Sequence, residues 1–291
     1  MCPLVARAVI VYGGTGTQNA TATGTDAPFD RVGIVNGCTG VYLGSIGGEH
    51  WVLTANHVGA GSFSLNGTSY SAVSGSAVPL LNTNGTEADL LLYRIDTPLD
   101  WSPLSLASSS ITTGTSVTMI GNGYNRATSL TTWYASGTGS STTWSTTWSA
   151  EAEAVSGYSW AGGNTLRWGT NTVSDAPALL SFNNTVCAGT TFDAIVDDAL
   201  PDEAQAAVGD SGGGVFTRRK DGTWTLSGIM LAIGVYANQP SAALLGDATY
   251  FADLSAYRNQ ILTTIPEPAT VPVLLGLAAL GCAVVRRWRR R

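Results

Sequence analysis

Charged residues, cysteine and histidine are all scarce in this 291-residue sequence. Asp, Glu, Lys and Arg together make up only 12% of it, and it has four cysteines, two histidines and no CxxC pair. A structural zinc site needs about four Cys or His ligands at close spacing, so the sequence predicts neither a metal nor another cofactor. Cys282 lies in an apolar tail, which leaves Cys2, Cys38 and Cys187 to pair, and no disulfide framework is expected.

Basic residues are also scarce outside the C-terminus. Five of the fourteen lie in the last six positions, whereas residues 1–264 carry nine basic and nineteen acidic side chains. Nucleic acid is bound through clustered Lys and Arg side chains. The acidic composition of residues 1–264 therefore excludes nucleic acid as a partner.

Blocks of helical periodicity are few, whereas glycine is abundant at 35 residues. Gly supplies turn conformations, and Thr, Val, Trp and Tyr fit a pleated surface. From residue 9 to about 264 the sequence therefore predicts one all-β domain, with Gly, Asn, Asp and Ser clusters between the strands. The predicted strands are Ala8–Tyr12, Gly40–Leu43, Trp51–Ala55, Asp89–Ile95, Ser116–Ile120, Thr223–Gly228 and Gly228–Tyr236.

Two segments of this domain differ from the rest. Residues 127–149 are rich in Ser, Thr and Trp, and we interpret them as a long exposed hairpin or loop with its tryptophans packed on one face. A carbohydrate-binding stripe is the alternative, although exposed aromatics need no special role. Tyr250–Ile261 has apolar residues at helical spacing, which predicts a C-terminal helix.

The N-terminal segment, residues 1–8, reads MCPLVARA and is too short for a signal peptide with a full apolar region. Its Ala6-Arg7-Ala8 has the A-x-A pattern of a signal cleavage site. The segment is therefore either the remnant of an export signal or an unstructured start.

The C-terminal segment, residues 265–291, has a different composition. Pro266 and Pro268 end the preceding helix, residues 269–285 form a run of 17 without a charge, and five arginines follow between Arg286 and Arg291. Such a run is at the short limit for a transmembrane helix. The arginines orient the C-terminus toward the cytoplasm. This segment predicts a single apolar helix that anchors the chain in a membrane.

Ser211 lies in the run Gly209-Asp210-Ser211-Gly212-Gly213. A serine hydroxyl becomes a nucleophile when a base takes its proton, and the backbone N–H groups of Gly209 and Ser211 are candidates for stabilising an oxyanion. The run also fits the G-x-S-x-G elbow of α/β-hydrolases, whose acid and histidine follow the serine. No histidine follows His57, so that fold has no base in this sequence.

The candidate base and acid precede the serine. His57 ends an apolar run that begins at Trp51, and Asp89 opens the apolar run Leu90–Tyr93. The order His, Asp, Ser is that of chymotrypsin, whereas subtilisin has Asp, His, Ser. The segments LTANHV, ADLLLY and GDSGGG resemble the three active-site segments of the trypsin/chymotrypsin family.

The resemblance covers residues 9–264 and implies two six-stranded antiparallel β-barrels, a C-terminal helix and an active site in the cleft between the barrels. It implies a serine endopeptidase that hydrolyses polypeptides through an acyl-enzyme intermediate. In that reaction His57 is the general base, Asp89 holds its tautomer and Ser211 attacks.

The specificity pocket implied by the resemblance comprises Gln205, Leu231, Ala232 and Ile233. Gln205 is neutral at the position that selects charged side chains in trypsin, so strict Arg or Lys specificity is not implied. Ile233 in the pocket favours small or medium apolar side chains, whereas a shift of one residue would place Gly234 there instead.

Asp210 is implied to pair with a freed N-terminal amine of an Ile or Val. Ile10-Val11 and Ile34-Val35 are the candidate starts. Ile34 abuts Cys38 and leaves no chain to reach the second barrel, so we expect a mature end near Val9 or Ile10.

The tail resembles a bacterial PEP-CTERM sorting signal, in which a Pro-Glu-Pro run precedes an apolar span and arginines. The resemblance implies export to the cell envelope or exterior, transient anchoring in the membrane and processing by an exosortase. A plain membrane anchor is the alternative for the tail. For the whole protein the alternative is a surface adhesion or matrix protein on a non-catalytic protease scaffold, with residues 127–149 binding glycan.

Overall fold

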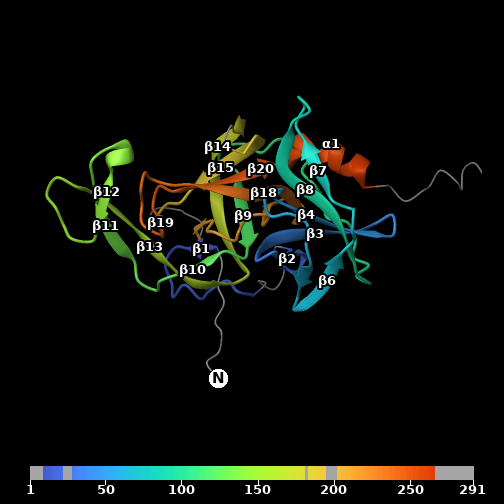
Figure 1. Ribbon diagram of the computed structural model, residues 1–291, viewed down its shortest axis with the longest axis horizontal. Coiled ribbons are helices and arrows are strands. Elements are labelled where there is room, and N and C mark those ends of the chain that lie inside the picture. The colour runs from blue at the N-terminus through green and yellow to red at the C-terminus, as the bar shows by residue number, and fades with distance from the viewer. Residues whose placement is uncertain (1–8, 22–27, 181–182, 195–201, 266–291) are drawn as a thin grey trace, which may run out of the picture.

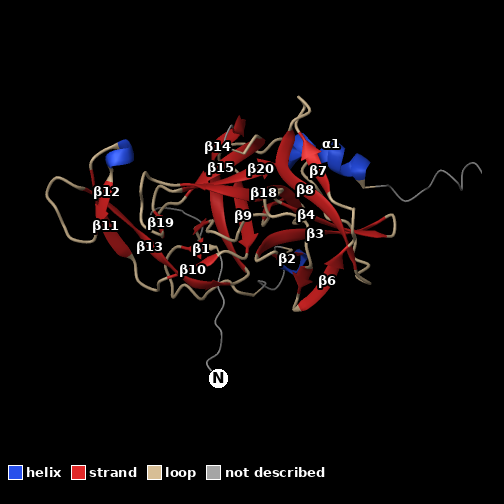
Figure 2. Ribbon diagram, viewed as in Figure 1, coloured by secondary structure: helices blue, strands red, loops and turns tan. Residues whose placement is uncertain are grey.

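The computed structural model describes residues 9–21, 28–180, 183–194 and 202–265. Residues 1–8 and the predicted tail helix therefore lie outside the described residues. Two β-barrels lie beside each other, a long β-arm extends from one end of the molecule, and a helix lies at the other (Figure 1). Strands dominate the structure (Figure 2), so the all-β prediction is confirmed.

The first barrel closes through six strands in the order β4-β3-β2-β5-β6-β8, because β8 pairs with both β6 and β4. A seventh strand, β7, pairs with β8. The bounds are β2 (Val32–Val35), β3 (Cys38–Ile46), β4 (Glu49–Thr54), β5 (Phe63–Leu65), β6 (Thr68–Ala72), β7 (Val78–Leu81) and β8 (Glu87–Asp96), and the 3-10 turn Phe29–Arg31 precedes them.

The second barrel also closes through six strands, in the order β14-β15-β20-β18-β17-β9. Its bounds are β9 (Ser116–Gly121), β14 (Arg167–Leu180), β15 (Thr185–Thr191), β17 (Gly214–Arg218), β18 (Trp224–Gly234) and β20 (Ala248–Asp253). The two strands predicted to meet at Gly228 are one continuous strand, β18. Gly228 is not at a turn: a side chain there would collide with Phe251 and the carbonyl of Ala252.

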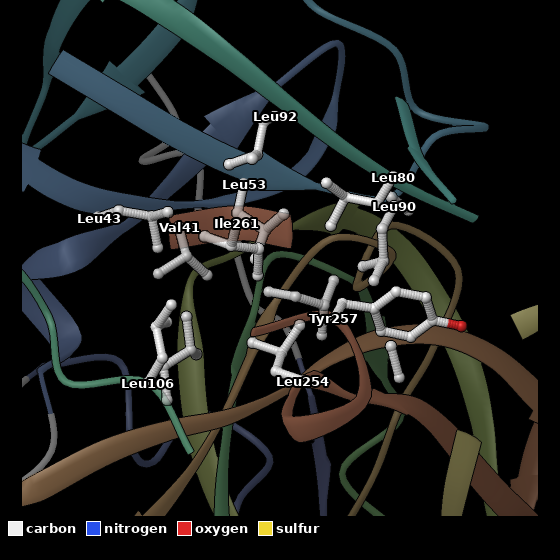
Figure 3. Close-up of a cluster of buried hydrophobic side chains, with 14 of the residues drawn as sticks. Val41, Leu43, Leu53, Leu80, Leu90, Leu92, Leu106, Leu254, Tyr257 and Ile261 are labelled. Carbon is white, nitrogen blue, oxygen red and sulfur yellow. The ribbon is translucent and has the colours of Figure 1, made fainter. Parts of the chain in front are cut away.

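The helix α1 (Leu254–Thr264) packs where the two barrels meet. Its Leu254, Tyr257 and Ile261 lie in one cluster with leucines and a valine of the first barrel (Figure 3). The hydroxyl of Tyr257 donates to Asn82 Oδ1 at 2.7 Å and accepts from the N–H of Val186 at 2.9 Å. One helical side chain therefore links a loop of the first barrel to a strand of the second.

The helix begins at Leu254 rather than at the predicted Tyr250. Residues up to Asp253 belong to β20, which pairs with β15 and β18 on its two sides. The Asp253 carboxylate accepts a hydrogen bond from the N–H of Ser255 at 3.0 Å and caps the first turn. Within the described ranges, no helix combines the length and the hydropathy of a membrane span.

Residues 127–149 form a hairpin, as predicted. It belongs to the arm β10 (Tyr124–Arg126), β11 (Thr131–Ser136), the 3-10 turn Gly139–Ser141, β12 (Thr143–Ser145) and β13 (Glu153–Asn164), against which β19 (Ala242–Leu244) pairs. Trp133 is buried, Trp144 is half-buried, and Trp148 is 70% exposed. The hairpin therefore does not present a row of exposed aromatic rings.

Candidate active site

His57 and Asp89 are brought together by the pairing of two strands in the first barrel. His57 follows the end of β4, and Asp89 lies near the start of β8, which pairs with β4. His57 Nδ1 lies 2.7 Å from Asp89 Oδ2, and the His57 backbone N–H donates to Asp89 Oδ1 at 2.9 Å. These two contacts fix the ring and assign the proton to Nδ1, which leaves Nε2 able to accept a proton.

The Asp89 carboxylate also sets the charge state of His57. Its hydrogen bond raises the pKa of His57 above the ordinary value of 6.5, and this effect exceeds the opposing effect of partial burial. The His57 side chain is 47% exposed and that of Asp89 is 13% exposed. The imidazolium is therefore stabilised at a position that solvent can reach.

Thr185 of the second barrel holds Asp89 in place through a hydrogen bond to its backbone. Its Oγ1 accepts a hydrogen bond from the Asp89 N–H at 2.7 Å and donates to the carbonyl of Asn183 at 2.8 Å. The sequence did not indicate this residue, because no motif surrounds it. Its contact ties the histidine–acid pair of one barrel to the other barrel.

The loop around Ser211 is shaped by Gly212, whose φ is +86°. This left-handed conformation favours glycine, and a side chain there would collide with the Thr39 carbonyl and Thr54 Oγ1. Thr39 of the first barrel binds the Ser211 loop through two hydrogen bonds. Its N–H donates to the Ser211 carbonyl at 3.0 Å, and its Oγ1 donates to the Gly209 carbonyl at 2.8 Å. Thr39 is a second residue that the sequence did not indicate.

The peptide between Val208 and Gly209 has a defined orientation. The Val208 carbonyl accepts a hydrogen bond from the N–H of Tyr124 at 2.8 Å. In a trans peptide the C=O and N–H groups point in opposite directions, and the described residues contain no cis peptide bond. The Gly209 N–H therefore points away from Tyr124, and Gly209 lines the same cavity as Ser211.

His57 and Ser211 line a common cavity of about 290 Å³. Leu231, Ala232 and Ile233, three of the residues predicted for the specificity pocket, line it too. The wall is completed by Ala206, Ala207, Val208 and Met230, together with Cys38 and the residues of the Ser211 loop. The side chains of this wall are mostly apolar.

Gln205, the fourth predicted pocket residue, does not line this cavity. It is 1% exposed, and its Nε2 donates to the Ala248 carbonyl at 2.9 Å while its Oε1 accepts from Thr249 Oγ1 at 3.0 Å. Both ends of the side-chain amide are therefore occupied within the protein.

Asp210 is fully buried beside the nucleophile loop. Its carboxyl accepts hydrogen bonds from the N–H groups of Ala207 at 2.7 Å and Gly123 at 2.6 Å, and from the backbone of Val9. Burial raises the pKa of Asp210 to about 7, against the opposing effect of these donors. Val9 is itself buried, next to the short strand β1 (Ile10–Val11), which pairs with β16 (Ala204–Gln205).

Cys38 and Cys187 are both free thiols. Among the described residues, no group of three or more His, Cys, Asp and Glu side chains could hold a metal ion.

Comparisons with known protein families match two separate segments of the chain. The trypsin-like peptidase domain matches residues 38–225, and the PEP-CTERM protein-sorting motif matches residues 264–291. A search of curated proteins found no significant match.

Among solved structures, kallikrein-related peptidase 10 in complex with Zn²⁺ matches 84% of this chain and 99% of its own, at 17% identity and a TM-score of 0.46. Neuropsin, a serine protease of the mouse brain limbic system, matches over 82% and 97%, at 17% identity and a TM-score of 0.45. An inactive form of Rv3671c from M. tuberculosis H37Rv matches over 81% and 83%, at 14% identity and a TM-score of 0.42.

Proposed function

Because the chain belongs to the family of trypsin-like peptidase domains, we propose that it is a serine endopeptidase with His57, Asp89 and Ser211 as its catalytic triad. The observation that carries the proposal is the hydrogen-bonded His57–Asp89 pair, whose histidine lines the same cavity as Ser211. Family membership supports the proposed reaction class, and this geometry supports the role proposed for each residue.

In the proposed reaction, His57 Nε2 takes the proton of the Ser211 hydroxyl as its Oγ attacks the carbonyl carbon of the substrate. Asp89 accepts from Nδ1 and stabilises the imidazolium that forms. The N–H groups of Gly209 and Ser211 stabilise the tetrahedral oxyanion. His57 then gives its proton to the leaving amine. Water hydrolyses the resulting acyl-enzyme with His57 again as the base.

The orientation of the 208–209 peptide supports the oxyanion assignment. If this peptide were turned over, the Val208 carbonyl and not the Gly209 N–H would face the cavity. The bond from the Tyr124 N–H holds it in the orientation that a donor requires. Such preorganised donors are worth about 3–4 kcal/mol of barrier each.

The same cavity is proposed as the specificity pocket, for small or medium apolar substrate side chains. No charged group on Leu231, Ala232 or Ile233 is available to a lysine or arginine of the substrate. Gln205 does not line the cavity, because its side chain is bonded to Ala248 within the protein. Asp210 is turned toward its own donors at Ala207, Gly123 and Val9. A cationic side chain would therefore lose its hydration without gaining a partner.

We also propose that the mature enzyme begins at Val9. A cut after Ala8 turns the Val9 N–H, already a donor to Asp210, into an ammonium group. The resulting ion pair would compensate the buried carboxylate and hold the nucleophile loop in its active form. The rival candidate near Ile34 lies in β2, a strand of the first barrel.

The C-terminal motif implies exosortase-dependent export to the cell surface. We propose that its apolar span anchors the chain transiently and that cleavage near Pro266–Pro268 releases the peptidase. Mass spectrometry of the native protein tests this step, because a retained Arg291 supports a permanent anchor instead.

A serine-reactive fluorophosphonate probe tests the catalytic proposal directly. Labelling of the wild-type protein is expected to vanish in Ser211→Ala and to persist in Ser149→Ala, which removes an exposed serine of the arm. Absence of labelling in correctly processed protein would favour the alternative of a surface adhesion or matrix protein on a non-catalytic scaffold.

A further inference from the structure

The wall of the catalytic cavity continues into an exposed apolar loop. Ile233 lines the cavity, β18 ends at Gly234, and the 235–239 loop follows at once. Val235 is 50% exposed and Tyr236 is 38% exposed. The apolar character of the proposed specificity pocket therefore extends onto the surface of the protein, through two side chains to which the proposed catalysis assigns no role.

The tip of the arm holds this loop through three hydrogen bonds. The loop lies between β18 and β19, on the side of the molecule from which the arm extends (Figure 1). The indole Nε1 of Trp144 donates to the carbonyl of Ala237 at 3.0 Å. In the opposite direction, Asn238 Nδ2 donates to the carbonyls of Ser140 and Thr142 at 3.0 and 3.1 Å. These bonds join segments that lie 93 to 98 positions apart in the sequence.

Ring contacts and backbone conformation fix the shape of the loop. The rings of Trp144 and Tyr236 meet edge to face, with their centroids 5.8 Å apart and an angle of 64° between their planes, an arrangement that aromatic pairs prefer. The Tyr236 hydroxyl donates to the Leu245 carbonyl at 3.0 Å. Asn238 has a φ of +54°, a left-handed conformation that asparagine and glycine adopt more readily than other residues. The arm and the loop therefore form one bonded unit beside the end of the cavity wall.

The inner end of the loop has a separate support. The Asp247 carboxylate accepts hydrogen bonds from Gln239 Nε2 at 3.0 Å and from the Leu244 N–H at 2.8 Å. Gln239 Nε2 also donates to the Ala242 carbonyl at 3.0 Å. None of these bonds involves the β11–β12 hairpin. A variant that removes the arm contacts therefore leaves the inner end of the loop in place.

The direction of β18 indicates which part of a substrate can reach the loop. Leu231 and Ala232 line both the Ser211 cavity and a second cavity beside His57, whereas Ile233 lines only the first. β18 therefore runs away from His57 toward the loop. In the proposed reaction His57 gives its proton to the leaving amine, so the segment after the cleaved bond lies beside His57. The residues before the cleaved bond are then the ones that can follow β18 to the loop.

We propose that the arm positions the 235–239 loop as an apolar extension of the specificity pocket, which contacts substrate residues that precede the one held in the cavity. Trp144 and Asn238 are the positioning residues, and Val235 and Tyr236 make the contact. Val235 lies two positions after Ile233, roughly 7 Å of extended chain, so substrate residues two or three positions before the one in the cavity reach it. The inference rests on the proposed peptidase function and specifies an extended apolar polypeptide segment as its substrate.

Hydrolysis of a short and a long substrate by the processed protein tests the proposal. Acetyl-Ala-Val p-nitroanilide fills the cavity alone, whereas acetyl-Leu-Leu-Ala-Val p-nitroanilide also reaches the loop. We expect the KM of the tetrapeptide to be at least about fivefold lower than that of the dipeptide, because its leucines leave water against Val235 and Tyr236. The kcat of the two substrates should be similar, since the reacting bond is the same. Equal KM values in the wild type would overturn the proposal.

Variants of the arm test the positioning role. Trp144→Ala and Asn238→Gly should each raise the KM of the tetrapeptide by about fivefold and leave its kcat and the KM of the dipeptide unchanged. Trp144→Phe keeps a ring against Tyr236 but loses the N–H donor, so its effect should be intermediate. The matched control is Trp148→Ala, which removes a 70% exposed tryptophan from the same segment and should change neither substrate. Should Trp144→Ala not fold, Asn238→Gly carries the comparison, because glycine tolerates the conformation of that position. An equal change for both substrates would show a general structural role of the arm and overturn the positioning role.

Two measurements separate this inference from the proposed function. The fluorophosphonate probe reacts at Ser211 and does not need the loop, so it should label the arm variants at the wild-type rate. Absence of labelling in the wild type would reject the catalytic proposal alone. Calorimetry on Ser211→Ala protein with the uncleaved tetrapeptide amide and dipeptide amide then tests the loop without catalysis. The tetrapeptide should bind at least about fivefold more tightly, and adding Trp144→Ala should abolish that advantage. Equal binding of the two peptides would overturn the inference.

Discussion

The backbone of Val9 donates a hydrogen bond to the buried carboxyl of Asp210, the residue immediately before Ser211. The contact joins the first described residue of the chain to the base of the nucleophile loop. We therefore expect the stability of the protein and its proposed activity to depend on where the mature chain begins.

Activity should depend on a free amine at Val9. We expect protein that begins at Val9 to have a kcat/KM at least tenfold higher than protein that retains residues 1–8, because an ammonium group pairs with Asp210 more strongly than an amide does. A chromogenic peptide assay on the two forms measures this. Equal rates for both forms would contradict it, as would N-terminal sequencing that places the mature end after residue 20.

Stability should fall with rising pH in the extended form. Burial raises the folded-state pKa of Asp210 to about 7 from its ordinary 3.8. Between these two pKa values, Asp210 therefore keeps its proton in the folded state and has released it in the unfolded state. The contribution of Asp210 to stability is present below pH about 4 and is lost as pH rises toward about 7. In protein beginning at Val9, the ammonium should reduce this loss.

Urea unfolding of both forms across this range measures the effect. Asp210→Asn is the reference variant, because residue 210 cannot ionise in it. Glu203 and Asp247, two other carboxyl groups whose pKa is raised by burial, still titrate in this variant. The difference between the extended form and its Asn variant should change with pH, whereas parallel curves would refute the role of Asp210.

The pH profile of hydrolysis should have its acid limb above pH 6.5. Asp89 raises the pKa of His57, and the reaction needs His57 neutral. Asp89→Asn should lower the His57 pKa and reduce kcat on the order of 10⁴-fold. Because the sequence has two histidines, an NMR titration can follow His57 with His50 as the internal comparison. An unchanged His57 pKa in Asp89→Asn would contradict the assignment.

The cavity beside Ser211 should select apolar side chains. Peptides with Ala, Val or Leu before the cleaved bond should be hydrolysed faster than those with Arg or Lys. Ile233→Gly should shift the preference toward Phe by about tenfold or more, as expected for added pocket volume. Gln205→Asp should not create Arg or Lys specificity, because the side chain at this position does not line the cavity. The variant should also be less stable, because it loses the hydrogen bond to the Ala248 carbonyl. A dominant Arg or Lys preference in the wild type would refute this assignment.

Gly212→Ala should disable the nucleophile loop. The added carbon collides with Thr39 and Thr54, at a backbone conformation that already disfavours alanine. We expect a loss of activity of more than a hundredfold and a stability loss larger than the roughly 1–2 kcal/mol of the conformational strain alone. The matched control is Gly75→Ala, where φ is +71° and no atom lies within 4 Å of the added carbon. Equal effects of the two variants would show that the contacts around Gly212 do not matter.

The three proposed triad residues could be found in the sequence because each lies in a short local pattern, an apolar run or a glycine cluster. Thr185 and Thr39 could not, because their roles depend on contacts made across the two barrels. The Asp89–Thr185 bond spans 96 positions and the Thr39–Gly209 bond spans 170. A lone threonine carries no local signal of such a partner.

The start of the helix was misplaced for a related reason. Tyr250 and Phe251 fit helical spacing, but β15 and β18 lie on both sides of that segment and pair with its backbone. Sheet pairing by distant strands therefore decides the conformation. Likewise, the composition of 127–149 indicated a hairpin, but not the anchoring of Trp144 Nε1 to the Ala237 carbonyl at 3.0 Å.

The helix α1 ends at Thr264, where the sorting motif begins. When the tail anchors the chain as proposed, a force on the domain acts first on this helix and then on the contact between the two barrels. Leu254, Tyr257 and Ile261 then resist the load together with the Tyr257 bonds to Asn82 and Val186. The helix next to the proposed anchor is therefore also the element that links the two barrels through Tyr257.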